Sequence, residues 1–119
     1  MQWNYVGGLF DGEGCVWYDS SVRVSISNTH KPVLDAVKKF VGYGTVRMDG
    51  DSKVWKWEAS GINAHHFLKS MLSVCEIKHP QISVALMIRD AHPEQREVLK
   101  AALKGLKTVR YEDRQNGSD

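Results

Sequence analysis

A glycine-rich apolar segment near the N-terminus, residues 5–16 (YVGGLFDGEGCV), constrains the fold of this chain more than any other feature. Its large side chains predict a helix from about residue 2 to residue 13 that is apolar on nearly all sides, and such a helix must be buried on all sides. Glycines nevertheless recur through it, and each weakens a helix by about 1 kcal/mol relative to alanine. Because a small domain cannot easily bury this helix alone, the segment indicates that another surface covers it.

The composition is that of one ordinary globular domain. The 119 residues are 42% apolar and 25% charged, which suits a single domain with a modest core. No apolar run approaches the roughly 18 residues of a membrane span and no secretory signal is visible, so no membrane partner is expected. The formal net charge is only +2. If DNA is the partner, the basic groups must therefore be concentrated on one surface.

Cys15 and Cys75 are the only cysteines, and they form no CxxC pattern. Neither a disulfide framework nor a zinc site is therefore expected, and this cysteine usage favours a reducing compartment. We expect an intracellular location, in the cytoplasm of a prokaryote or phage host, with an organelle as the alternative.

Hydrophobic periodicity predicts an α+β fold with the order αββαββα, followed by two C-terminal helices. Alternating apolar and polar residues predict four strands, at 15–19, 22–28, 45–49 and 54–59, that form one antiparallel sheet with helices on one face. The helical pattern after the first helix predicts helices at 31–41, 62–75, 80–91 and 92–107. Residues 1–109 would then form one domain. Helices within 80–107 would be its C-terminal extension, and residues 110–119 a disordered tail.

The face of this sheet that points away from the helices is predicted to be polar. Strand residues alternate, so the apolar set faces the helices and the polar set faces solvent. The polar face carries hydrogen-bonding side chains and several cations: Trp17, Asp19, Arg23, Ser25, Ser27, Arg47, Asp49, Lys56 and Glu58. Taken by itself, this pattern fits a solvated surface as well as it fits a binding surface.

The segment Val6–Gly14 (VGGLFDGEG) resembles the nine-residue signature of the LAGLIDADG homing endonucleases. Valine stands at its first position, glycines replace its alanines, phenylalanine replaces its isoleucine, and Glu13 replaces its second aspartate. The αββαββα order that follows is that of one family domain, so the resemblance covers roughly residues 2–92. It implies a saddle-shaped sheet that binds double-stranded DNA. Because the chain has one motif, it also implies a homodimer.

The resemblance places the first helix at the homodimer interface, through Val6, Gly8, Leu9, Asp11 and Gly12. Gly8 and Gly12 lie one turn apart and leave a groove in which another backbone can approach closely. The alternative is that the glycines pack against the sheet of their own chain. Residues 11 and 13 lie about 200° apart on a helix and cannot both face one phosphate. Asp11 is therefore predicted to accept hydrogen bonds from backbone at the helix ends or across the interface.

By the same resemblance, Glu13 corresponds to the metal-binding acid of the family. It lies at a helix C-terminus, where backbone carbonyls favour a cation, and the Gly12 carbonyl is a second candidate ligand. Oxygen ligands with several waters left on the metal favour Mg²⁺, for which Mn²⁺ is an expected substitute.

Two positions outside the signature complete the active site that the resemblance implies. Lys78 corresponds to a basic residue close to the scissile phosphate, where its charge would stabilise the transition state. Asn28 corresponds to a polar residue that orders solvent, and Ser27 or His30 is the alternative for that role.

The polar sheet face would be a DNA-reading surface if it lies in the major groove, where a β-ribbon presents side chains to base edges. Arg23 and Arg47 are the best candidates for contacts with guanine, and Trp17 is a candidate for contact with a thymine methyl. The remaining polar residues would read other base edges: Asp19, Ser25, Ser27, Asp49, Lys56 and Glu58.

The sequence thus predicts a homodimeric, Mg²⁺-dependent, site-specific endonuclease that cuts both strands of a long pseudo-palindromic DNA target. Its biological role would be the mobility of an intron, intein or free-standing element. The first alternative is a non-cleaving protein on the same fold, either an RNA splicing maturase, with RNA as a partner, or a DNA-binding regulator. Glu13 speaks against lost catalysis but does not exclude a maturase. The second alternative is a small α+β interaction domain whose glycine-rich helix only dimerises.

Overall fold

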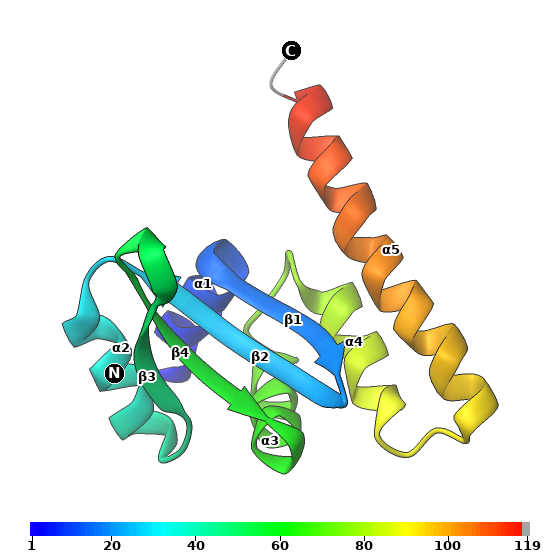
Figure 1. The fold of residues 1–119 in the computed structure, drawn as a ribbon, viewed down its shortest axis with the longest axis horizontal. Coiled ribbons are helices and arrows are strands. Elements are labelled where there is room, and N and C mark those ends of the chain that lie inside the picture. The colour runs from blue at the N-terminus through cyan, green and yellow to red at the C-terminus, as the bar shows by residue number, and fades with distance from the viewer. Residues whose placement is uncertain (118–119) are drawn as a thin grey trace.

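The chain forms one four-stranded antiparallel sheet with helices against one of its faces (Figure 1). The computed structural model describes residues 1–117, and the side chains of these residues apart from those of residue 51 and residues 107–117. The predicted α+β class and the αββαββα order are confirmed. The helices are α1 (Trp3–Glu13), α2 (Lys31–Val41), the short 3-10 helix η1 (Gly50–Ser52), α3 (Gly61–Met71), α4 (His79–Ile88) and α5 (Pro93–Gly117). The strands are β1 (Gly14–Asp19), β2 (Ser21–Asn28), β3 (Thr45–Asp49) and β4 (Val54–Ser60).

The strands lie in the order β1-β2-β4-β3, and each neighbouring pair is antiparallel. The register pairs Gly14 with Ile26, Ile26 with Trp57, and Trp57 with Val46. Ile26 and Trp57 are fully buried, so this row faces the helices and the rows on either side of it face away. The predicted alternation is confirmed, and it gives the sheet one apolar face and one polar face.

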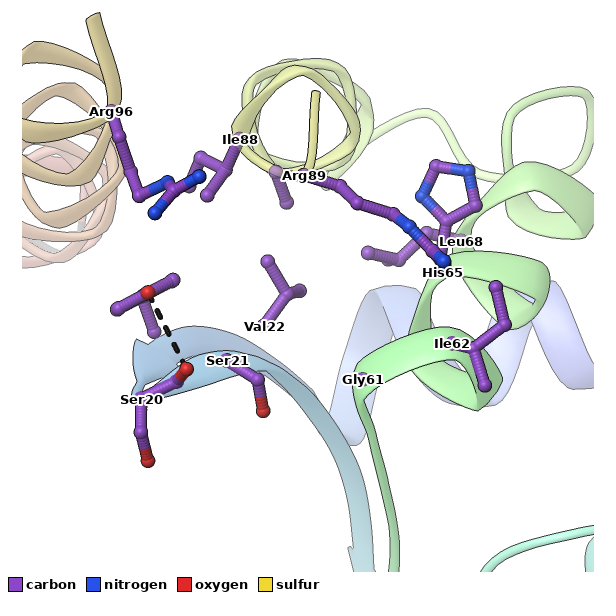
Figure 2. A pocket seen from close by; sticks show the side chains of 12 residues that line it. Ser20, Ser21, Val22, Gly61, Ile62, His65, Leu68, Ile88, Arg89 and Arg96 are labelled. Carbon is purple, nitrogen blue, oxygen red and sulfur yellow. Dashed lines mark hydrogen bonds between the residues drawn. The ribbon is translucent and has the colours of Figure 1, made fainter. Parts of the chain in front are cut away.

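The turn between β1 and β2 lies at one end of the sheet, beside α3, α4 and α5. α4 contacts β1, α3 and α5, and its residues Ile82, Ala85 and Ile88 are buried. This helix is therefore part of the hydrophobic core. A pocket of about 330 Å³ lies between the β1–β2 turn, the start of α3 and the connection from α4 to α5 (Figure 2).

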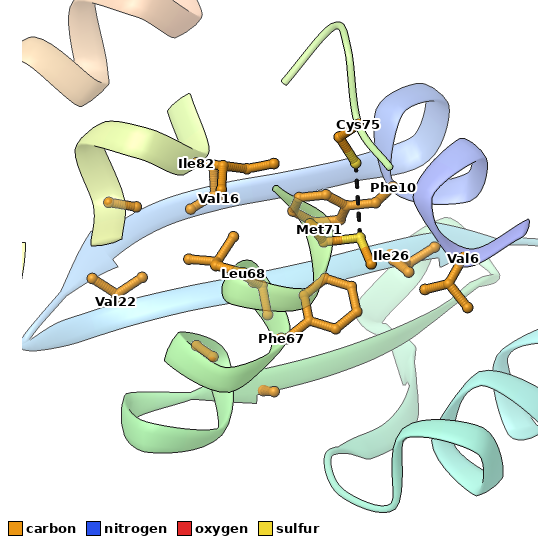
Figure 3. Close-up of a cluster of buried hydrophobic side chains, with 14 of the residues drawn as sticks. Val6, Phe10, Val16, Val22, Ile26, Phe67, Leu68, Met71, Cys75 and Ile82 are labelled. Atoms are coloured by element: carbon orange, nitrogen blue, oxygen red, sulfur yellow. Dashed lines mark hydrogen bonds between the residues drawn. The ribbon is translucent and has the colours of Figure 1, made fainter. Parts of the chain in front are cut away.

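The core fills the space between the sheet and the helices, where side chains from α1, α3 and the strands meet (Figure 3). Phe67 of α3 lies at its centre, with ring centroids 5.1 Å from Phe10 and 4.8 Å from Trp57. The Trp57 indole N–H donates to the Tyr43 carbonyl at 3.1 Å, so its polar atom is satisfied inside the core. This packing fixes the orientation of α1 on the sheet.

α5 is longer than the sequence predicts, and Figure 1 shows it projecting away from the sheet. It packs near its start, where Leu103 is buried, and it continues to Gly117. Residues 110–117 are thus helical where a disordered tail is predicted, and residues 118–119 lie outside the described residues. Arginine, glutamate and glutamine favour helix without any packing partner, so polarity alone does not end a helix. No described helix is both long and apolar enough to cross a membrane.

Candidate functional site

α1 turns one face into the core of its own chain. Val6, Gly7 and Phe10 are buried, and a Cβ on Gly7 would lie 2.6 Å from Cγ2 of Val74. Gly7 therefore allows α1 to pack closely on the segment that follows α3. The sequence predicts Val6 at a dimer interface, but Val6 has no exposed surface in a single copy. The interface prediction is wrong for Val6, because its helical position faces the sheet.

The opposite face of α1 is open. Tyr5 is 53% exposed, and a Cβ on Gly8 or Gly12 would meet nothing within 4 Å. Packing within the chain therefore accounts for Gly7, whereas Gly8 and Gly12 face free space. Sequence reasoning missed Tyr5 as a member of this open face, although its spacing of three and seven residues from the two glycines places all three on one stripe. Leu9 is half-buried at the edge of the stripe.

Asp11 joins α1 to the segment that precedes α4. Its carboxylate accepts hydrogen bonds from the backbone N–H groups of Glu76 at 2.9 Å and Lys78 at 3.0 Å. Burial raises the pKa of the Asp11 carboxyl, but hydrogen bonds from the backbone of residues 76–78 outweigh it, and the net pKa is lowered. The predicted role in binding backbone is confirmed, and these partners belong to the same chain.

Asp11→Asn should destabilise the protein by about 2 kcal/mol, because an amide group replaces a charged acceptor that faces backbone donors. The lowered pKa means that the unfolded chain binds this proton more readily than the folded chain. The contribution of Asp11 is therefore fully present above its ordinary pKa of 3.8 and is lost as the pH falls through the folded-state pKa. Urea unfolding between pH 3 and pH 7 checks this. If lowering the pH below 4 destabilised Asp11→Asn as much as it destabilised the wild type, this role of the Asp11 carboxylate would be contradicted.

The Cys75 thiol lies beside Asp11 but is not a reactive group. It donates to the Gly7 carbonyl at 3.3 Å and contacts the Met71 sulfur in the core (Figure 3). Burial, together with the negative charge of Asp11, raises the pKa of Cys75 to about 12. The thiol thus stays protonated at neutral pH and serves packing.

Lys78 is buried beside the end of α1. The residue is only 7% exposed, its Nζ donates to the Asp11 carbonyl oxygen at 2.9 Å, and the same nitrogen lies 5.8 Å from the centre of the Phe10 ring. An exposed, solubilising lysine would show none of these contacts. The structure thus holds the positive charge of Lys78 on the Asp11 carbonyl, which is two residues before Glu13 in α1.

Glu13 is the last residue of α1, and its side chain is exposed. The backbone carbonyls of a helix C-terminus carry partial negative charge at this end. Among the side chains that the structure describes, no three of His, Cys, Asp or Glu lie close enough together to hold a metal ion. A single exposed carboxylate nevertheless suits Mg²⁺, which binds one or two carboxylates and completes its shell with waters and phosphate oxygens.

The three candidates for ordering water lie where β2 passes the end of α1. The Asn28 side-chain oxygen accepts from the His30 N–H at 2.8 Å, which shapes the turn into α2. Ser27 pairs with Lys56 and, by the alternation of the strand, points to the polar face. His30 is exposed in the turn itself. The structure therefore brings Ser27, rather than Asn28, to the polar face beside Glu13.

The predicted polar residues share one face of the sheet, and ion pairs connect the charged ones. Glu58, in the middle, lies 3.0 Å from the Arg47 guanidinium and 3.9 Å from that of Arg23, and Lys56 lies 3.5 Å from Asp49. Sequence reasoning placed these residues on one face but could not show that Glu58 holds both arginines. That requires the register of three strands.

The two ends of the polar face have different surroundings. Trp17, on the edge strand β1, lines a groove against α5 with Lys100 and Leu103. The Arg23 Nε donates to the Asp19 carbonyl at 3.2 Å, which fixes this guanidinium near the β1–β2 turn. Ser25 is buried between neighbouring strands, so it has less access to a ligand than the other predicted contact residues.

No family model and no curated protein matches this chain, but solved structures match its fold. The homing endonuclease I-CvuI, in complex with its target, superimposes with a TM-score of 0.77 at 18% identity, over 87% of this chain and 80% of that chain. An archaeal intron-encoded homing endonuclease, I-Vdi141I, complexed with DNA, gives 0.75 at 16% identity, over 87% and 82%. The LAGLIDADG meganuclease I-AabMI, bound to uncleaved DNA, gives 0.71 at 15% identity, over 87% and 45%. This is the LAGLIDADG fold.

The LAGLIDADG fold gives a common framework to the features described above. The segment Val6–Gly14 that resembles the signature forms most of α1 and enters β1. The sheet that follows has its polar face open, and α1 has its glycine stripe open. Both surfaces that the sequence singled out are thus accessible in one copy of the chain.

Proposed function

We propose that this chain is a LAGLIDADG homing endonuclease that cuts double-stranded DNA at a specific site as a homodimer. The observation that carries the proposal is the end of α1, where Glu13 is exposed and the buried Lys78 donates to the Asp11 carbonyl two residues earlier. The fold supports it, because I-CvuI and I-Vdi141I are homing endonucleases with the same fold in complexes with DNA.

The open face of α1 supports a second copy as the partner. Tyr5 offers apolar surface there, and the absence of side chains at Gly8 and Gly12 allows a second backbone to come close. The lengths agree, because this chain covers 45% of I-AabMI, so two copies would match one such chain. Crossing at α1 would bring the two Glu13 carboxylates near the symmetry axis, one for each DNA strand.

The residues at the end of α1 have complementary roles in phosphodiester hydrolysis. Glu13 would hold Mg²⁺, with Mn²⁺ as a substitute, and the Gly12 carbonyl is the second candidate ligand. When bound there, the ion would supply Lewis-acid polarisation of the phosphate and of a water molecule. The Lys78 ammonium, fixed on the Asp11 carbonyl, would stabilise the negative charge that develops on the phosphate, and its burial strengthens that effect. Ser27 would orient water.

The polar face would lie in the major groove and read base edges. Its three cations, Arg23, Arg47 and Lys56, are already near acidic partners in the free protein. This arrangement holds the guanidinium groups in place before DNA arrives, which lowers the entropy lost on binding. A fixed arginine suits the bidentate contact with guanine.

Arg23→Ala should relax discrimination at one base pair in each half-site, with a loss of about 1–3 kcal/mol between the preferred base and the others. Lys38→Ala is the matched control. Lys38 is exposed on α2, and its loss should at most lower the salt dependence of binding. Competition binding with single-base variants of the target measures both. Equal effects of the two substitutions on base preference would remove Arg23 from the reading surface.

Selection of cleaved sites from a randomised DNA library in Mg²⁺ tests the proposal as a whole. We expect a long, pseudo-palindromic consensus with both strands cut, as two copies of one chain would produce. Bound but uncut DNA, or preferential binding of structured RNA, would instead identify a regulator or a maturase on the same fold. A true endonuclease with such a long site would support the mobility of the intron, intein or free-standing element that encodes it.

A further inference from the structure

Glu58 lies at the centre of the polar face of the sheet. It belongs to β4, between the strands β2 and β3, and its direct neighbours across the sheet are Ser25 and Thr45. Its side chain is only 14% exposed, whereas that of Arg47 nearby is 63% exposed. A carboxylate with so little access to water needs partners for its charge, and two arginines supply them.

The two oxygens of the Glu58 carboxylate face different arginines. Oε2 accepts from the Arg47 guanidinium at 3.0 Å, and Oε1 lies 3.9 Å from the guanidinium of Arg23. Arg23 has a second anchor, because its Nε donates to the Asp19 carbonyl at 3.2 Å. Among the described residues, Arg47 has no hydrogen-bond or ion-pair partner other than Glu58. Glu58 is thus shared between one arginine that is held elsewhere as well and one that is not.

The shared carboxylate also holds two positive charges close together. Both guanidinium groups lie within 4 Å of it, so they would repel each other if its negative charge were removed. Each guanidinium has five N–H donors, and a bidentate contact with guanine uses two of them. Either arginine can therefore contact a base and keep Glu58 as a partner at the same time.

The two arginines are placed to reach different base pairs. Arg23 lies beside Ser60 of β4, and Arg47 lies beside Lys56 of the same strand. Their backbones are therefore about 13 Å apart along β4, at about 3.3 Å per residue. Successive base pairs are only about 3.4 Å apart. Two contacts that are separate on the DNA thus depend on one side chain of the protein.

We propose that Glu58 is a positioning residue that couples the base preferences of Arg23 and Arg47. The inference rests on the proposed function and adds to it a dependence between two positions of each half-site. When Arg47 contacts its base it fixes the shared carboxylate, and the carboxylate in turn fixes Arg23. Loss of either base contact leaves Glu58 less constrained and so weakens the other contact.

The test is a double-mutant cycle on the DNA, measured as duplex affinity for the selected target without divalent metal. Arg23→Ala and Arg47→Ala first identify the two base pairs, as the positions where each variant loses most of its preference. These base pairs are then replaced singly and together in both half-sites. With the wild type, the second replacement should weaken binding at least about threefold less when the first is already present. With Glu58→Gln, the two effects should multiply to within about twofold.

Asp35→Asn is the matched control for the loss of charge. Asp35 is an exposed acid on α2 that pairs with Lys31 at 2.8 Å, so its replacement also removes one negative charge and one ion pair. This variant should keep the coupling of the wild type. Coupling that persists in Glu58→Gln, or that disappears in Asp35→Asn, would overturn the assignment to Glu58.

The same variants separate positioning from other roles of Glu58. In Glu58→Gln, discrimination at the Arg47 base pair should fall more than at the Arg23 base pair, because Arg23 keeps the Asp19 carbonyl. An equal loss at every position of the site would show a purely structural role and overturn the proposal. A changed preference at a base pair that neither arginine variant affects would also overturn it, because Glu58 would then read a base itself.

Failure of this inference and failure of the proposed function give different results. Sequence-specific binding by the wild type without coupling between the two positions would overturn the role of Glu58 alone. No sequence-specific binding by the wild type would overturn the proposed function, and the role of Glu58 with it.

Discussion

Glu13→Gln should abolish cleavage of both DNA strands and leave DNA binding intact. The substitution keeps the shape of the side chain but removes the negative charge that would hold the metal ion. Metal-based stabilisation of a phosphoryl transition state is worth several kcal/mol, and each 1.4 kcal/mol is a factor of ten in rate. We therefore expect a loss of roughly 10³-fold or more in the single-turnover rate, measured on a selected target in Mg²⁺.

The structure makes this substitution a clean one. The Glu13 side chain is exposed at the end of α1, so neither the core nor the fold depends on it. Glu76→Gln is the matched control, because Glu76 is an exposed acid whose backbone N–H, rather than its side chain, contacts Asp11. Glu76→Gln should cut DNA at the wild-type rate. Retained cleavage by Glu13→Gln would remove this residue from the metal site, and loss of DNA binding would assign it to recognition instead.

Gly8→Gln should convert the protein to a monomer without destabilising its fold. A Cβ on Gly8 meets nothing within 4 Å in a single copy, and replacing a helical glycine stabilises the helix by up to about 1 kcal/mol. The same side chain would stand between two helices that cross at this point. We expect one species of half the wild-type mass by analytical ultracentrifugation at micromolar concentration, together with loss of double-strand cleavage.

Two further glycines provide the controls for that experiment. A Cβ on Gly105, in α5, would also meet nothing within 4 Å, so Gly105→Gln should leave the dimer intact. Gly7→Ala, one residue away on α1, should destabilise the chain itself, because its Cβ would lie 2.6 Å from Val74. A dimeric Gly8→Gln variant, or a wild-type chain that is a monomer at micromolar concentration, would contradict the α1 interface.

Local pattern was enough to identify the strands and the faces of the sheet. Side chains on a strand alternate with a period of two, so Arg23, Arg47 and Glu58 could be assigned to one face without coordinates. That Asp11 and Glu13 point in different directions also followed from helix geometry. Asp11 does bind backbone, and Glu13 is exposed at the helix end.

Other features depend on segments that are far apart in the sequence. Nothing near Lys78 in the chain shows that it is buried on the Asp11 carbonyl, because that contact joins residues 67 positions apart. The position of Val6 in the core, and of Tyr5 on the open face, depends on how α1 rotates against the sheet. Glu58 lies between two arginines only because β4 runs between β2 and β3.

The sequence by itself determined the order of the elements, the polar face of the sheet and the different directions of Asp11 and Glu13 on the first helix. Each of these follows from the spacing of neighbouring residues. Only the tertiary structure decided which glycines of α1 are free and where Lys78 places its charge. These depend on packing between distant segments, which fixes helix rotation and side-chain burial through the shape of the whole core. The segment YVGGLFDGEGCV is therefore a helix with two different faces: Gly7 packs inward, and Gly8 and Gly12 lie open.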